Sequence, residues 1–127
     1  MKKLLLLLAL LLSFSYAQAI EPGFIKYTES TSGASFYYHP KSIKKRGGLV
    51  YVWTMNNVGG YTNGGFYFES KHQIIINCKT YEIDTAYIQR LDTKGNVISS
   101  VNYRTREWTP IPPDSVSEML AGIVCKK

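Results

Sequence analysis

The chain has 127 residues, of which 45% are hydrophobic and 13% aromatic. This length leaves room for one domain of ordinary size and little more. Fifteen basic and nine acidic residues give a formal net charge of +6, a mild excess compared with the dense basicity of nucleic-acid-binding proteins. The composition therefore indicates a small globular protein and argues against a nucleic acid as its partner.

The first segment has the three regions of a secretory signal peptide. Two lysines follow the initiator methionine, residues 4–12 form an unbroken apolar run, and "AQA" at residues 17–19 is a cleavage motif. The apolar run is about half of the roughly 20 residues that a membrane span needs, so we expect removal of residues 1–19 and a single mature domain at residues 20–127. No cysteine follows the run to carry a lipid anchor. We expect an exported, soluble protein at the cell surface or in the periplasm.

Short strands separated by turn residues are expected over most of the remaining chain. Residues 24–27 and 35–38 are brief extended segments on either side of a turn rich in Ser, Thr and Gly. Residues 49–55, "LVYVWTM", are apolar at alternate positions on both faces. That pattern is typical of a central strand with both faces covered.

The middle of the chain predicts three longer strands. Residues 66–78 alternate between apolar and polar side chains, which predicts one strand that directs Cys78 into the core. Residues 81–91 predict a second strand, ended by the turn "DTKGN" at residues 92–96, and residues 97–103 predict the third.

Cys78 and Cys125 are the only cysteines in the chain. In an exported protein, an even pair of cysteines is typical of a disulfide. A zinc site would need closely spaced ligands, whereas His39 and His72 stand far from both cysteines and from each other in sequence. His72 would lie roughly 20 Å from Cys78 along one strand, too far for a catalytic pair, but this spacing leaves His39 open. We expect a disulfide, and neither a metal nor a cofactor.

The C-terminal segment changes to a helical pattern. Three prolines precede Ser115 and Glu118, which form a capping-box signature for the start of a helix. The apolar residues that follow have the spacing of one buried helix face: Val116, Met119, Leu120, Ile123 and Val124. We expect the helix to end near Val124, so that Cys125 can reach Cys78 from its unwound exit. Strands followed by one helix predict an α+β domain with the helix packed on one face of the sheet.

The strand at residues 49–55 needs cover on both faces, and one helix supplies only one. A homodimer through the other face would shield side chains such as Tyr51 and Trp53 from water.

Four stretches of sequence occur together in a recognisable order: "FYYHPKSIKKRGGLVYVW" (36–53), "SKHQIIINCKTYEI" (70–83), "GNVISS" (95–100) and "EWTPIPPDSVSEMLAGIVC" (107–125). From about Phe24 to Cys125 the chain resembles the surface-adhesin protein E-like family of Gram-negative bacteria. Most specific is the pairing of "INC" with the "EW-x-PI-x-P-x-S" segment and a helix that ends in Cys. The resemblance implies a single curved antiparallel sheet of about six strands, with a disulfide tying the C-terminal helix to it.

The resemblance also implies a function. The family is named for an outer-membrane adhesin that binds host matrix proteins, which implies a non-enzymatic surface adhesin with a macromolecular partner. The alternative is a periplasmic structural or inhibitory protein of the cell envelope with no host-binding role. A third hypothesis is an enzyme built around His39 or His72, although the sequence shows no catalytic constellation. The chain departs from the family at Phe24, where members commonly have Trp, and at His39 and Asn77, where they often have Asp.

One candidate contact for an acidic partner is the run "KSIKKRGG". It places Lys41, Lys44, Lys45 and Arg46 ahead of a Gly-Gly turn, where they would suit an acidic protein patch, a heparin-like glycan or lipopolysaccharide phosphate. The alternative is a solvated turn whose lysines protect a sheet edge from aggregation.

A second candidate is the segment "NNVGGYTNGG" at residues 56–65. It predicts a long hairpin connection with Asn63-Gly64 at its tip and Tyr61 as an exposed aromatic contact.

Overall fold

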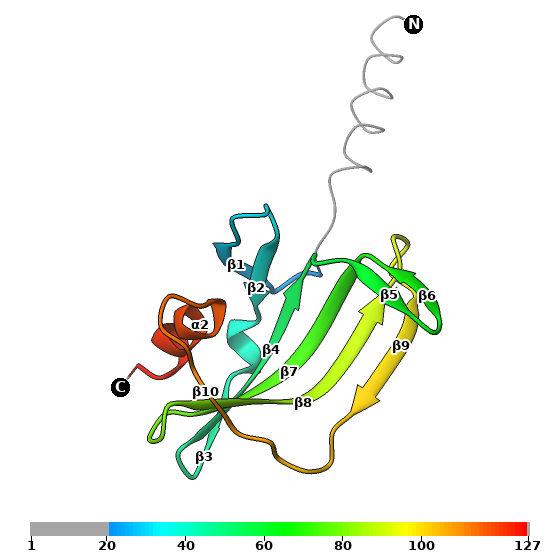
Figure 1. Ribbon diagram of the computed structural model, residues 1–127. Coiled ribbons are helices and arrows are strands. Elements are labelled where there is room, and N and C mark those ends of the chain that lie inside the picture. Colours follow the sequence, from blue (N-terminus) through cyan, green and yellow to red (C-terminus); the bar gives the residue numbers. More distant parts are fainter. Residues whose placement is uncertain (1–20, 127) are drawn as a thin grey trace, which may run out of the picture.

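The computed structural model describes residues 21–126, so the expected signal peptide lies outside the described part of the chain. The described residues form an antiparallel sheet with one α-helix near the C-terminus (Figure 1). The strands are β1 (Ile25–Glu29), β2 (Ser35–Tyr38), β3 (Lys44–Arg46), β4 (Leu49–Asn56), β5 (Gly60–Thr62), β6 (Gly65–Tyr67), β7 (Glu69–Asn77), β8 (Glu82–Leu91), β9 (Val97–Asn102) and β10 (Thr109–Pro110); the helices are the 3-10 helix η1 (Pro40–Ser42) and α2 (Val116–Val124). The α+β class is confirmed.

Eight strands form the main sheet. Six follow the order β1-β2-β4-β7-β8-β10, while β3 pairs with β4 and β9 pairs with β8, all of them antiparallel. The sequence does not predict β3, because its three residues are all basic, or β10, because it is two residues long and contains a proline. Both are short strands that add to the longer ones.

The core lies between α2 and the face of the sheet that β4 and β7 share. Val50 and Val52 pair with Ile76 and Ile74 across the two strands, and Val52 and Ile76 are fully buried. The buried cluster consists of Val50, Val52, Ile74, Ile76, Ile111, Leu120, Ala121 and Val124. β-branched residues dominate its strand half because they pack well on a pleated surface. Figure 1 shows α2 beside β1 and β2 at one side of the sheet.

Helix α2 begins and ends where the sequence predicts. The Ser115 hydroxyl accepts a hydrogen bond from the backbone N–H of Glu118 at 3.1 Å, which satisfies one of the N–H groups left free at a helix start. The helix ends at Val124, with Cys125 as its C-cap.

The expectation that Met119 lies on the buried face of the helix is wrong. Met119 is 50% exposed, whereas Ala121 is 1% exposed. Successive helical residues are about 100° apart, so a face centred between Leu120 and Val124 includes Ala121 and turns Met119 towards water.

The expectation of one strand over residues 66–78 is also wrong. β6 ends and β7 begins on either side of Phe68, and β6 pairs with β5 in a separate two-stranded sheet. Phe66 and Phe68 are 47% and 39% exposed, so neither joins Ile74 and Ile76 in the core. Because β6 pairs with β5, the hairpin lies outside the main sheet. The apolar and polar side chains of β6 therefore do not continue the two faces of β7.

Cys78 and Cys125 form a disulfide with a Cα–Cα distance of 5.6 Å, as the sequence predicts. Cys78 follows β7 directly and Cys125 follows α2, so the bond ties the end of the helix to the sheet across a sequence separation of 47. Both residues pack against the core. Since each sulfur is bonded to the other, neither is available as a nucleophile or a metal ligand.

Candidate functional site

Basic side chains from three segments of the chain gather around the disulfide. Lys44, Lys45 and Arg46 form β3, Lys79 follows Cys78 in the turn between β7 and β8, and Lys126 follows Cys125. All five are exposed. We call Lys44, Lys45, Arg46, Lys79 and Lys126 the basic end.

Two contacts connect these segments. The Lys45 ammonium group donates a hydrogen bond to the Lys126 carbonyl oxygen at 3.3 Å. The Lys79 side chain lies against Gly48 in the β3–β4 turn, with its Cε atom 3.3 Å from the place where a Cβ atom would stand. The three segments therefore form one continuous basic surface.

Sequence reasoning finds the β3 cations but misses Lys79 and Lys126. Each of these lysines directly follows one of the paired cysteines, so the expected disulfide already implies that they lie close together. Lys41, the fourth predicted contact, is exposed in η1 and does not belong to β3.

Alternation divides the cations of β3 between two faces of the sheet. Lys45 pairs with Val50, whose side chain is in the core, so Lys45 lies on the face that carries α2, in agreement with its bond to Lys126. Lys44 and Arg46 lie on the opposite face. β3 pairs with β4 at a sheet margin, where lysines also discourage pairing with another chain.

Tyr61 lies at the other end of the sheet. It belongs to the β5–β6 hairpin, whose turn is Asn63-Gly64 as expected, and its side chain is 83% exposed. Its ring packs edge-on against Phe66, with ring centroids 5.3 Å apart. Figure 1 shows this hairpin far from β3. The structure therefore does not bring Tyr61 together with the basic end.

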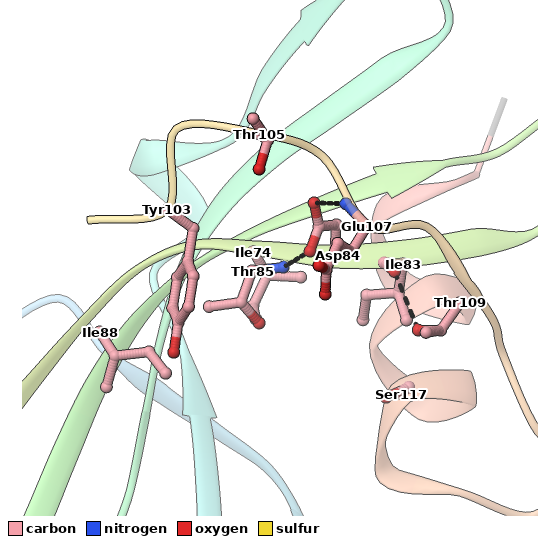
Figure 2. A pocket seen from close by; sticks show the side chains of 10 residues that line it. All are labelled: Ile74, Ile83, Asp84, Thr85, Ile88, Tyr103, Thr105, Glu107, Thr109 and Ser117. Atoms are coloured by element: carbon pink, nitrogen blue, oxygen red, sulfur yellow. Dashed lines mark hydrogen bonds between the residues drawn. The ribbon is translucent and has the colours of Figure 1, made fainter. Parts of the chain in front are cut away.

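A cavity of about 490 Å³ beside β8 contains two carboxylate residues, Asp84 and Glu107 (Figure 2). The Asp84 carboxylate accepts hydrogen bonds from the backbone N–H groups of Thr85 at 2.7 Å and Glu107 at 2.9 Å. It also lies 3.4 Å from the Arg106 guanidinium group. These contacts tie the loop at residues 103–108 to β8, so the geometry gives Asp84 a structural role.

The two histidines have separate environments. His72 is half-buried on β7, where its Nε2 atom lies 2.8 Å from the Ser70 hydroxyl. Burial, together with the smaller effect of the nearby Arg90 charge, lowers the pKa of His72 to about 4. His39 packs its ring edge-on against Phe24, with centroids 5.0 Å apart. With both cysteines bonded, the Cys–His pair that the sequence leaves open at His39 does not form.

The face of β4 opposite α2 is partly covered by the chain itself. Met55 is 1% exposed and lies in a hollow that Glu21 and Pro22 help to line. Trp53 packs edge-on against Tyr87, with centroids 5.8 Å apart. The need for a second copy on this face is therefore smaller than the sequence suggests, and the homodimer stays a prediction.

Two further features bear on the expectations from the sequence. Within residues 21–126, no helix is both long enough and apolar enough to cross a membrane. In the same part of the chain, no group of three or more His, Cys, Asp or Glu side chains could hold a metal ion.

The fold and the basic end define a small disulfide-tied α+β protein with an exposed basic surface. The chain matches the family described as "Surface-adhesin protein E" over residues 24–126, and it belongs to this family. The structure of Haemophilus influenzae protein E is similar, with 17% sequence identity, a TM-score of 0.59, and 84% of this chain and 86% of that chain covered. Crystal form II of the same protein gives 16% identity, a TM-score of 0.61, and 84% and 90% coverage. At these identities the likeness shows a shared fold. A search of curated proteins gives no match.

Proposed function

We propose that this protein is an exported, non-enzymatic surface adhesin that binds an acidic macromolecule through its basic end. The observation that carries the proposal is the gathering of Lys45, Lys79 and Lys126 from three distant segments into one surface. Membership of the adhesin family supports the class of function. A cluster of exposed like charges raises the local concentration of an oppositely charged partner and speeds its association.

Heparin tests this proposal as a model acidic glycan. Replacing Lys44, Lys45 and Arg46 together by serine should weaken heparin binding about 100-fold, because each of the three cations near an anionic surface contributes about 1 kcal/mol. The salt dependence of binding should also flatten, since fewer charges remain to be screened. Affinity is measured by surface plasmon resonance over a series of salt concentrations.

The matched control replaces Lys26, Lys94 and Arg104 by serine, which removes the same charge from exposed positions outside the basic end. This control should bind heparin close to wild-type affinity. Equal weakening of both triple variants would mean that net charge alone attracts heparin, and the basic end would lose its role.

The location of the protein is tested on cells. Protease added to intact cells should degrade the protein, whereas a periplasmic marker should survive until the outer membrane is permeabilised. An immunoblot follows both proteins. If the protein survives along with the marker, it is a periplasmic component of the cell envelope, and the adhesin proposal is wrong for this chain.

A further inference from the structure

A cleft of about 350 Å³ opens at the basic end, between the β3–β4 turn, the turn after β7 and the end of α2. Leu49, Val50 and Val124 line it together with the disulfide. Val50 and Val124 are 3% and 2% exposed, so they form a fixed apolar floor that belongs to the core. The floor of the cleft is therefore apolar although the cleft lies within the basic end.

The same cleft is lined by three exposed cations: Lys45, Lys79 and Lys126. None of the described residues that line it is acidic. The carbonyl end of α2 also faces this region, and a helix C-terminus carries about half a negative charge. Three ammonium groups exceed that charge several-fold, so the mouth of the cleft remains cationic.

We propose that this cleft binds an anionic lipid, with the phosphate on the lysines and part of an acyl chain along the apolar floor. The proposal rests on the proposed function, because it names a ligand for the same basic end. Charge complementarity selects an anionic headgroup, and the apolar lining selects a hydrocarbon attached to it.

The lining favours a lipid over an acidic peptide. Every residue of a peptide backbone brings a donor and an acceptor that need partners when they leave water. The floor of the cleft offers valine side chains and the disulfide, which supply no strong partners. An alkyl chain has no such requirement, and its burial from water is favourable in proportion to its area.

Alkyl phosphates with 4, 8 and 12 carbons, below their micelle concentrations, test the two halves of the ligand separately. Affinity measured by isothermal titration calorimetry should rise with chain length, by up to about fourfold for each methylene that is fully buried. Inorganic phosphate should bind far more weakly than dodecyl phosphate. Octyl glucoside, an uncharged detergent, should bind more weakly than octyl phosphate.

Two charge-matched double variants locate the site. Lys45→Ser/Lys79→Ser removes two cations from the cleft and should weaken dodecyl phosphate binding at least tenfold. Lys44→Ser/Arg46→Ser removes the same charge from the other face of β3 and should change it less than twofold. Circular dichroism and thermal unfolding check that each variant is folded.

The outcomes separate this inference from the proposed function. Equal affinity for all three chain lengths, equal binding of octyl glucoside, or equal weakening by both double variants would overturn the lipid site. If affinity is equal for all three chain lengths but heparin still binds, the lipid site is wrong and the adhesin proposal stands. Chain-length-dependent binding in a protein that does not bind heparin would support the lipid site and refute the acidic macromolecule.

Discussion

Replacing Cys78 and Cys125 together by alanine is expected to lower the free energy of unfolding by about 4 kcal/mol. The disulfide closes a loop with a sequence separation of 47. In the chain-entropy account, closing such a loop lowers the conformational entropy of the unfolded chain and so raises its free energy by about 4 kcal/mol. A small domain has only about 5–15 kcal/mol of stability in total. The double variant should therefore lose a large share of its stability and unfold at a lower temperature than the wild type.

Urea unfolding of the variant and the wild type, followed by circular dichroism, measures this difference. Wild-type protein unfolded in the presence of a thiol reductant should behave like the double variant, because both lack the bond. The variant without reductant should show a lower midpoint in urea. A difference below about 1 kcal/mol would show that the core cluster around Val52 and Ile76 holds α2 on the sheet without help from the disulfide.

Lowering the pH from 7 to 4 is expected to destabilise the protein through His72 by at most about 3 kcal/mol. Burial lowers the pKa of His72 to about 4, whereas the unfolded chain has the ordinary value near 6.5. Above pH 6.5 the imidazole is neutral in both states and the full stability is present. Between 6.5 and 4 the unfolded state binds a proton that the folded state does not, so stability falls as the pH falls. Below pH 4 both states are protonated and this loss is complete.

His72→Gln isolates the effect of the histidine, because glutamine can hydrogen-bond to Ser70 but carries no charge. Urea midpoints at pH 7, 5.5 and 4 should fall steeply in the wild type and much less in the variant. Glu69 has the opposite effect on the pH dependence of stability. Burial and the Glu21 charge raise its pKa, so its contribution to stability increases as the pH falls. Asp92 acts at lower pH, because hydrogen bonds from the Asn96 and Lys94 backbones lower its pKa. Parallel curves for the two proteins would contradict the assignment to His72.

Local patterns predict much of this fold because local physics decides them. The cap at Ser115, the end of α2 at Val124 and the turn at residues 92–96 each depend on neighbouring side chains and backbone groups. The disulfide follows from cysteine number and an expected oxidising compartment. These features need no knowledge of the distant chain.

Other features depend on contacts between distant segments, and the sequence predicts them poorly. The alternation of apolar and polar residues over 66–78 continues through Phe68. The strand nevertheless breaks there, because β6 pairs with β5 and not with the main sheet. Met119 is exposed because the sheet presents its apolar surface to a helix face centred on other residues.

The β5–β6 hairpin forms a two-stranded sheet of its own between β4 and β7 in the sequence. Asn56 and Ser70 pair directly where the chain leaves the main sheet and returns to it, and the Ser70 hydroxyl donates to the Asn56 side-chain oxygen at 3.1 Å. The pairing of β4 with β7 therefore keeps its register whatever connects the two strands, and each doubling of a loop's length costs only about 0.6 kcal/mol. Residues 60–67, which pair with one another, are consequently the part of this connection that should best accept a change of surface sequence. Asn57 and Phe68, on either side of them, donate backbone hydrogen bonds to β2 and β8. The hairpin itself is a natural insertion point for an epitope in an engineered version.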